Sequence, residues 1–180
     1  MSLLYNRKVL LGVSGSIAAY KSAHLVRELI KRGAEVQVVI TDAAKDFVTP
    51  LTLSTLSTRP VYSAFIEDEQ KAYGVWNNHV EMGLWADLMV IAPASSNTLS
   101  KMATGACDNL LTAVYLSAKC PVFAAPAMDL DMYANGATSD NLKVLEQRGV
   151  GIIDSDYGEL ASGLVGKGRM AEPEAIYDHL

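Results

Sequence analysis

Short segments rich in glycine and serine follow the apolar runs of this sequence, and they are the segments best suited to chemistry. The first covers residues 12–21 (GVSGSIAAYK) and carries hydroxyl groups at Ser14 and Ser16. Backbone N–H groups and the dipole at a helix start attract phosphate, and serine hydroxyls add donors. A tight turn with a serine cap explains the same residues about equally well. The spacing does not match G-x-G-x-x-G, and Thr41 follows the next apolar run, so a mononucleotide is favoured over a dinucleotide.

The second segment covers residues 77–87 (NNHVEMGLWAD) and contains His79. An imidazole exchanges protons near neutral pH, so His79 is a candidate general base. A single histidine is more often structural or solvated, and the neighbouring acids Glu81 and Asp87 suit capping or solvation equally well.

The third segment covers residues 92–101 (APASSNTLSK) and leads through Gly105 to residues 108–111 (DNLL). Its four consecutive polar residues, 95–98, offer donors and acceptors to the ring or sugar chain of a bound cofactor. Capping of a helix start would also explain them.

The fourth candidate combines residues 126–132 (PAMDLDM) with residues 158–170 (GELASGLVGKGRM). The second stretch is interrupted by glycines, which favours a mobile lid over the interior of a helix or strand. Lys167 or Arg169 could clamp a carboxylate or phosphate. An ordinary surface loop is an equally serious interpretation.

The elements that must position these segments alternate between strands and helices. Apolar runs over 8–13, 36–40, 87–92 and 121–125 predict buried strands, and 151–153 repeats the pattern. Apolar residues at helical spacing before Arg32-Gly33 predict a helix that ends there. Further helices are expected over 43–47, 50–57, 141–148 and from residue 97 to about residue 119. An acidic loop is expected over 67–71. The sequence therefore predicts an α/β fold with a three-layer, doubly wound parallel sheet, in which ligands bind beyond the carboxyl ends of the strands.

Composition and charge exclude several classes of function. A chain of 180 residues that is 50% hydrophobic suits a single domain spanning 1–180. A net charge of −5 gives no attraction to nucleic acid, and the longest apolar runs are far too short to cross a membrane. Cys107 and Cys120 lack the spacing of metal ligands, so we expect no metal site. Reduced cysteines and the lack of a secretory pattern at the N-terminus favour a cytoplasmic location.

Taken together, the four segments resemble the flavin-containing cysteine decarboxylase family, and most closely its members in coenzyme A biosynthesis. The resemblance extends from about Arg7 to Glu174, and the order of its motifs makes it specific. These motifs are GSIAAYK (15–21), HVE (79–81), APASSNT (92–98), DNLL (108–111), PAM (126–128) and GRM (168–170).

The resemblance implies a Rossmann-like or flavodoxin-like flavoprotein that binds FMN. It assigns the cofactor to one set of residues, the catalytic proton transfers to a second and the substrate to a third. The cofactor set is Gly15, Ser16, Ile17, Thr41, Ser95, Ser96, Asn97, Thr98 and Ala127; the catalytic set is His79 and Ser162; the substrate set is Met128, Asp129, Arg169 and Met170.

The implied reaction is FMN-dependent decarboxylation of 4′-phosphopantothenoylcysteine to 4′-phosphopantetheine. Oxidation of the thiol to a thioaldehyde by the flavin would create the electron sink that decarboxylation requires. The resemblance also implies a homo-oligomer, built from trimers, and a C-terminal synthetase that often follows such a domain in a longer chain. Alternatives are a peptidyl-cysteine decarboxylase of the lantibiotic type and a non-catalytic, flavin-binding regulatory protein; flavin prenyltransferases, which lack the histidine and PAM segments, fit less well.

Two residues depart from the family pattern. Asp129 stands where the family has an asparagine that contacts the substrate carboxylate, and it would repel that group unless it is protonated or Arg169 or Lys167 compensates. Ser162 aligns with the family's proton-donating cysteine, and a hydroxyl is a much weaker acid than a thiol.

Overall fold

The computed structural model describes residues 4–67 and 75–180, so the expected acidic loop over 67–71 lies mostly outside the described residues. Its centre is a parallel sheet of six strands in the order β3-β2-β1-β6-β7-β8. These strands are β1 (Lys8–Val13), β2 (Glu35–Ile40), β3 (Val61–Tyr62), β6 (Leu88–Ala94), β7 (Val122–Pro126) and β8 (Gly151–Ile152). The α/β class and the doubly wound sheet are thus confirmed.

The chain changes direction across the sheet at β1, which pairs with β2 on one side and with β6 on the other. After β3 the chain returns to the middle of the sheet and then adds β7 and β8 beyond β6. The loops after β1 and β6 separate at this switch point, and α/β proteins bind ligands in such crevices. The topology therefore places the predicted segments 12–21 and 92–101 side by side.

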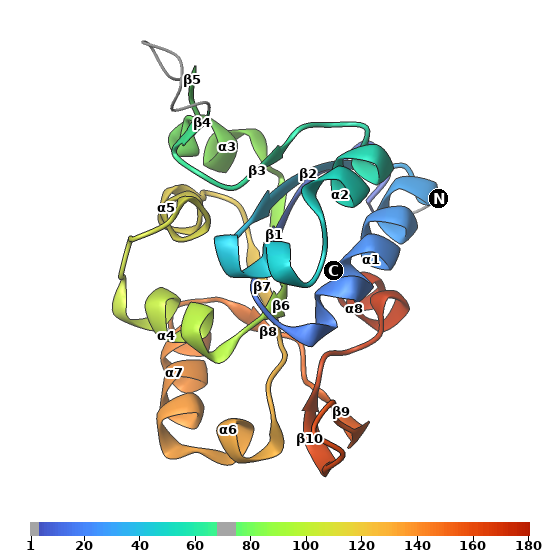
Figure 1. The fold of residues 1–180 in the computed structure, drawn as a ribbon. Helices are drawn as coiled ribbons and strands as arrows, with labels where there is room; N and C mark the ends of the chain where they lie inside the picture. Colours follow the sequence, from blue (N-terminus) through green and yellow to red (C-terminus); the bar gives the residue numbers. More distant parts are fainter. Residues whose placement is uncertain (1–3, 68–74) are drawn as a thin grey trace.

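Helices cover both faces of the sheet (Figure 1), and each face has its own apolar core. Helices α1 (Tyr20–Lys31), α2 (Pro50–Ser57) and α8 (Pro173–His179) contribute to the core that contains Leu25, Leu53 and Ile176. The other core lies beneath α3 (His79–Trp85), α4 (Ser96–Thr104), α5 (Leu110–Ser117) and α7 (Gly136–Gln147). Shorter helices are η1 (Ile17–Ala19), η2 (Asp42–Asp46) and α6 (Leu130–Ala134).

Burial explains why the central strands have nearly continuous apolar sequences. All seven residues of β6 are buried, and in β1 only Lys8 is partly exposed. A strand covered by helices on both faces needs apolar side chains at every position rather than at alternate ones. The sequence pattern and the three-layer packing therefore agree.

Two antiparallel hairpins stand outside the central sheet. One pairs β4 (Ile66–Glu67) with β5 (Val75–Trp76) beside α3, and the other pairs β9 (Asp156–Glu159) with β10 (Val165–Arg169). The second hairpin occupies the stretch expected to be a lid without strands, so that expectation was wrong in detail. It projects from the main body next to α6 (Figure 1).

Candidate active site

A cavity of about 500 Å³ lies beyond the carboxyl ends of the central strands. Its walls come from the loops after β1, β2, β6 and β7 and from the α4–α5 connection, which are far apart in the sequence. The lining residues are Gly15, Ser16, Thr41, Asp42, Ala43, Ser95, Ser96, Asn97, Thr98, Lys101, Asp108, Asn109, Ala127, Met128 and Met132. We call this space the first cavity; its volume is typical of sites for small molecules and cofactors.

Ser14 ties two walls of the first cavity together. Its side chain is buried, with a 1% exposed fraction, and its hydroxyl donates to the carbonyl of Pro93 at 2.7 Å. The same hydroxyl accepts from the backbone N–H of Ser95 at 2.8 Å. Because Ser95 caps α4, one side chain at the end of β1 fixes where α4 begins.

Two helix starts meet at the cavity. The Ser16 hydroxyl caps η1 by accepting from the N–H of Ala18, and η1 continues directly into α1. The Ser95 hydroxyl caps α4 by accepting from the N–H of Thr98. Helix starts carry partial positive charge and spare N–H donors, so this edge of the cavity suits an anionic group such as a phosphate.

Thr41 supplies a polar atom that has no hydrogen-bond partner among residues 4–67 and 75–180. Its Oγ1 is buried and forms no hydrogen bond in the structure, although Thr41 lines the cavity. Buried hydroxyl groups are normally hydrogen-bonded, so an unpaired one at a cavity wall indicates a ligand atom there. Gly15 lets the loops after β1 and β2 approach closely at this wall, because an added Cβ would lie 2.7 Å from the Cβ of Ala43.

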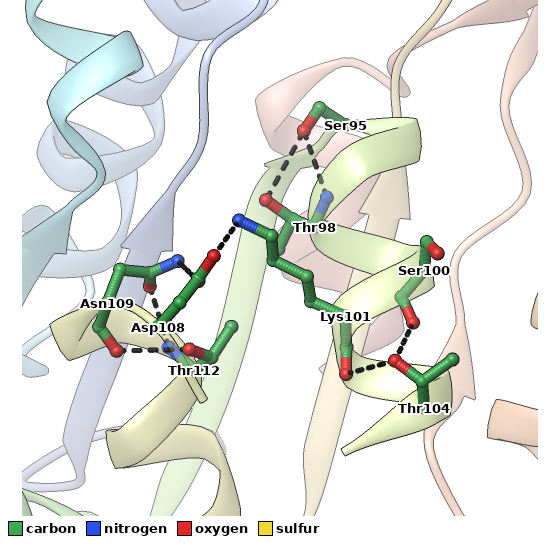
Figure 2. A network of polar contacts seen from close by, with 8 residues as sticks. All are labelled: Ser95, Thr98, Ser100, Lys101, Thr104, Asp108, Asn109 and Thr112. Atoms are coloured by element: carbon green, nitrogen blue, oxygen red, sulfur yellow. Dashed lines mark hydrogen bonds and ion pairs between the residues drawn. The ribbon is translucent and has the colours of Figure 1, made fainter. Parts of the chain in front are cut away.

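A charged pair forms the wall made by α4 and the start of α5 (Figure 2). The ammonium of Lys101 lies 2.7 Å from the carboxylate of Asp108, and hydrogen bonding to Lys101 lowers the pKa of Asp108. The side chain of Asn109 both contacts Asp108 and caps α5 through the N–H of Thr112. Lys101 thus gives this wall a fixed cation.

A second cavity of about 470 Å³ adjoins the first and shares Ser16, Ala127 and Met128 with it. It lies between the start of α1 and the β9–β10 hairpin. Its other lining residues are Ile17, Ala18, Tyr20, Lys21, Asp129, Glu159, Leu160, Ala161, Gly168, Arg169 and Met170. A molecule in the second cavity would therefore contact whatever occupies the first.

Glycines let the β9–β10 hairpin lie close to the loop after β7. In β10 the buried positions are Gly166 and Gly168, and a Cβ at either would overlap the side chain of Leu130 or the carbonyl of Met128. The N–H of Met128 donates to the carbonyl of Gly168 at 3.1 Å. The glycine pattern therefore reflects close packing against Met128 and Leu130.

One carboxylate, that of Glu172, pairs with both cations of the second cavity. Glu172 accepts from Lys21 at 2.9 Å and from Arg169 at 2.8 Å, and Lys21 also donates to the carbonyl of Met170. Hydrogen bonding to Lys21, followed by that to Arg169, lowers the pKa of Glu172. These contacts join α1 to the end of the hairpin.

The structure brings most of the predicted site residues together, but not all of them. The first cavity is lined by Gly15, Ser16, Thr41, Ser95, Ser96, Asn97, Thr98, Ala127 and Met128, and the second by Ile17, Asp129, Arg169 and Met170. His79 and Ser162 line neither cavity. Ser162 is exposed at the tip of the hairpin, where its hydroxyl accepts from the N–H of Leu164.

His79 begins α3 and lies between two aromatic rings. Its ring makes edge-on contacts with Phe65 and Trp76, at centroid distances of 5.9 and 6.1 Å. Its Nδ1 atom is buried and has no hydrogen-bond partner in the structure. Asn78 caps the helix through the N–H groups of Val80 and Glu81, which fixes the position of the ring.

Neither Lys167 nor Arg169, the two basic residues that could balance the charge of Asp129, pairs with it. Lys167 pairs with Asp154 at 3.0 Å, and Arg169 pairs with Glu172. Asp129 instead accepts from the N–H of Leu130 at 2.6 Å and caps α6. Of the conditions under which Asp129 would tolerate a substrate carboxylate, pairing with Lys167 or Arg169 is thus not seen within the described part of the chain.

Sequence reasoning did not assign site roles to Lys101, Asp108, Asn109 or Lys21, although all four line a cavity. Each lies inside a segment that the sequence had marked. Charged residues beside polar post-strand residues indicate a site, so the sequence could have marked Lys101 and Asp108. Their pairing could not be predicted, because it depends on how α4 packs against α5.

No group of three or more His, Cys, Asp and Glu side chains that could hold a metal ion occurs among residues 4–67 and 75–180. Across the same residues, no helix has the length and apolar character needed to span a membrane.

Comparison with protein families matches residues 2–180 to the family described as Flavoprotein. The coenzyme A biosynthesis bifunctional protein CoaBC of Vibrio parahaemolyticus is 46% identical over 173 residues, covering 96% of this chain and 43% of that protein. A cysteine/cysteine sulfinic acid decarboxylase from an unknown prokaryotic organism is 58% identical over 129 residues, covering 72% of this chain and 35% of that protein. The chain thus spans well under half the length of these two curated relatives.

Solved structures agree with the sequence matches. A mutant of PPC decarboxylase complexed with pantothenoylaminoethenethiol has a TM-score of 0.83 and 39% identity, covering 97% of this chain and 96% of that one. The FMN-binding protein AtHal3 has a TM-score of 0.81 and 38% identity, covering 97% and 94%. Sequence, fold and the residues around the two cavities lead to the same conclusion: the chain belongs to the Flavoprotein family.

Proposed function

We propose that the first cavity binds FMN. The unpaired Oγ1 of Thr41 and the two helix starts at Ser16 and Ser95 fit a ligand with a phosphate and many polar atoms. The family match and the similarity to an FMN-binding protein support the same cofactor. In this proposal residues 15–17 hold the phosphate, while Thr41, residues 95–98 and Ala127 contact the rest of the cofactor.

The reaction that the two adjoining cavities support is FMN-dependent decarboxylation of a cysteine-derived carboxylate, and its first candidate is conversion of 4′-phosphopantothenoylcysteine to 4′-phosphopantetheine, a step of coenzyme A biosynthesis. The observation that carries this proposal is the second cavity, which shares Ser16, Ala127 and Met128 with the proposed flavin site. Similarity to PPC decarboxylase and to CoaBC supports this substrate. FMN, when bound, supplies a reversible two-electron oxidation that gives decarboxylation an electron sink.

The chain's own residues would position the substrate and move protons. Met128, Asp129, Arg169 and Met170 line the second cavity and would hold the substrate beside the flavin. His79 would act as the base, and its unpaired Nδ1 is consistent with a hydrogen bond that forms only when another molecule binds beside it. Ser162 would deliver the final proton from the hairpin, directly or through water, more slowly than a thiol would.

We also propose that the protein is a homo-oligomer, built from trimers, in which His79 serves a neighbouring subunit. His79 lines neither cavity of its own chain. Large apolar side chains are exposed around it, with exposed fractions of 57% for Trp76, 43% for Val80 and 63% for Leu84. Such a surface favours burial against another copy, which would bring His79 to a second subunit's cavity. In each subunit, residues 1–180 form a single domain.

The proposed location is the cytoplasm, because a reducing compartment suits the free cysteines and a biosynthetic role.

The proposed reaction is tested by turnover of the FMN-loaded protein under anaerobic conditions. We expect carbon dioxide and a fully reduced thiol product from 4′-phosphopantothenoylcysteine. A product two hydrogens lighter would show that the oxidative half proceeds and that Ser162 fails as proton donor. Absence of carbon dioxide from both this substrate and L-cysteine would contradict the proposed decarboxylation, and absence from 4′-phosphopantothenoylcysteine alone would leave the second candidate reaction below.

Replacement His79→Asn isolates the role of the histidine. Asparagine keeps a polar side chain at the first position of α3, so the flavin site should stay intact and the protein should stay yellow. We expect turnover to fall by about 10²–10⁴-fold, the usual contribution of a general acid–base group. Turnover close to that of the wild type would remove His79 from the mechanism.

A second candidate reaction is decarboxylation of free cysteine or cysteine sulfinic acid. The relative named for that activity is 58% identical to this chain over the 129 residues aligned. Both candidates begin with a cysteine-derived carboxylate beside FMN. Free cysteine differs from 4′-phosphopantothenoylcysteine in that its nitrogen is not acylated, whereas cysteine sulfinic acid also has an oxidised sulfur and offers no thiol for the flavin to oxidise.

A further inference from the structure

The charges of the second cavity are arranged unevenly. Both of its cations, Lys21 and Arg169, share Glu172 as their partner. Neither of its carboxylates, Asp129 and Glu159, forms an ion pair with another described residue. Counting Glu172, the group has two cations and three carboxylates, so the cavity and its immediate surroundings carry excess negative charge.

Asp129 retains the capacity to bind a ligand. Its Oδ1 is used in capping α6, through the N–H of Leu130, whereas its Oδ2 has no hydrogen bond in the structure. An ionised carboxylate accepts several hydrogen bonds, so one cap leaves most of its capacity free. The side chain is partly exposed and lines the cavity.

Arg169 retains donors as well. The structure uses one of its N–H groups for Glu172, and a guanidinium has five donors in a fixed planar fork. The cavity thus presents an available cation at Arg169 and an available anion at Asp129. This pair complements an amino acid that carries both a carboxylate and an ammonium group.

Resting on the second candidate reaction, decarboxylation of free cysteine, we propose that a thiol amino acid with a free α-ammonium group is preferred over N-acylated cysteines such as 4′-phosphopantothenoylcysteine. Asp129 binds the ammonium, and Arg169 binds the carboxylate through charge-assisted hydrogen bonds. An N-acylated cysteine offers only a neutral amide N–H to Asp129, so acylation removes the stronger of the two possible contacts. Asp129 is therefore a specificity-determining residue.

The test compares L-cysteine with N-acetyl-L-cysteine as substrates of the FMN-loaded protein, measured as kcat/KM for carbon dioxide release. The wild type should prefer cysteine. Asp129→Asn should lower the cysteine-to-N-acetylcysteine ratio by at least about tenfold, because it removes the charge from a charge-assisted hydrogen bond to the ammonium group. Asparagine caps helices as well as aspartate does, so α6 should remain folded. Asp131→Asn, which removes the same charge from an exposed position of α6 outside the cavity, should leave the ratio unchanged.

A binding measurement separates this inference from catalysis. Cysteamine keeps the thiol and the ammonium, N-acetylcysteamine keeps only the thiol, and neither can be decarboxylated. We expect cysteamine to perturb the flavin absorbance at lower concentration than N-acetylcysteamine in the wild type, and the difference to vanish in Asp129→Asn.

The outcomes distinguish failure of the inference from failure of the proposed function. Turnover of N-acetylcysteine or 4′-phosphopantothenoylcysteine with a substrate ratio that Asp129→Asn does not change would overturn the inference and leave decarboxylation standing. No turnover of any thiol acid would overturn decarboxylation; the cysteamine comparison would then still decide whether Asp129 selects an ammonium group.

Discussion

Removing the Ser14 hydroxyl should damage the proposed flavin site more than removing a comparable buried hydroxyl elsewhere. Ser14 and Ser22 are both buried serines, and both donate to carbonyl groups near the end of β6. Only Ser14 also accepts from a backbone N–H, that of Ser95 at the start of α4. Ser22→Ala is therefore a matched control for Ser14→Ala.

The expected magnitudes follow from these hydrogen bonds. Ser22→Ala loses one ordinary hydrogen bond, which costs about 0.5–1.5 kcal/mol of unfolding free energy. Ser14→Ala also leaves the N–H of Ser95 without its partner in a partly buried position, which raises the cost to about 1–3 kcal/mol. Because Ser95 caps α4 and lines the first cavity, we expect FMN affinity to fall about tenfold, or about 1.4 kcal/mol.

Two measurements on each variant check this reasoning. Urea unfolding of the protein without FMN gives the loss of stability, and titration of flavin fluorescence gives the dissociation constant of FMN. The reasoning predicts weaker FMN binding in Ser14→Ala than in Ser22→Ala, beyond their difference in stability. Equal FMN affinity in the two variants would refute the claim that Ser14 positions the wall of the first cavity.

Gly15→Ala should weaken FMN binding about 5- to 100-fold, because the added methyl group must displace Ala43 and overpacking costs about 1–3 kcal/mol. Flavin titration measures this loss of affinity. Gly136→Ala is the control, since its added methyl group meets no atom within 4 Å, and it should bind FMN normally. For Glu172, hydrogen bonding to Lys21 lowers the pKa, so its contribution to stability is complete above about pH 4.5 and is lost as the pH falls through the lowered value. Urea unfolding between about pH 3 and about pH 7 should therefore show a shallower acid loss of stability in Glu172→Gln than in the wild type, and parallel curves would contradict that reasoning.

The sequence predicted the central sheet well because its signal is local. The apolar runs expected at 36–40, 87–92 and 121–125 are strands β2, β6 and β7, with ends shifted by one or two residues. Strands buried on both faces need apolar side chains throughout, so their sequences are distinctive. The post-strand location of the site followed from this topology.

Helix α3 was missed although its start carries a recognisable signal. Asn78 followed three residues later by Glu81 matches the pattern of a helix N-terminus, and Asn78 does cap α3. The helix is short, and its exposed Val80 and Leu84 obscure the alternation of polar and apolar faces.

The β9–β10 hairpin was interpreted as a lid because of its glycines. Gly166 and Gly168 are instead the inward positions of β10, where Leu130 and Met128 leave no room for a side chain. Such contacts join residues far apart in the sequence, so no local pattern could reveal them. Arg169 and Glu172 are only three residues apart, but the second partner of Glu172, Lys21, lies on α1, and that pairing depends on how the end of the hairpin packs against α1.

The central claim is that FMN in the first cavity and a cysteine-derived carboxylate in the second react with loss of carbon dioxide. The most direct measurement follows bound flavin and carbon dioxide release in one anaerobic sample of the FMN-loaded protein, with 4′-phosphopantothenoylcysteine and L-cysteine supplied separately. Bound FMN together with carbon dioxide from at least one of the two substrates is the predicted result. Bound FMN with no carbon dioxide from either would contradict the account.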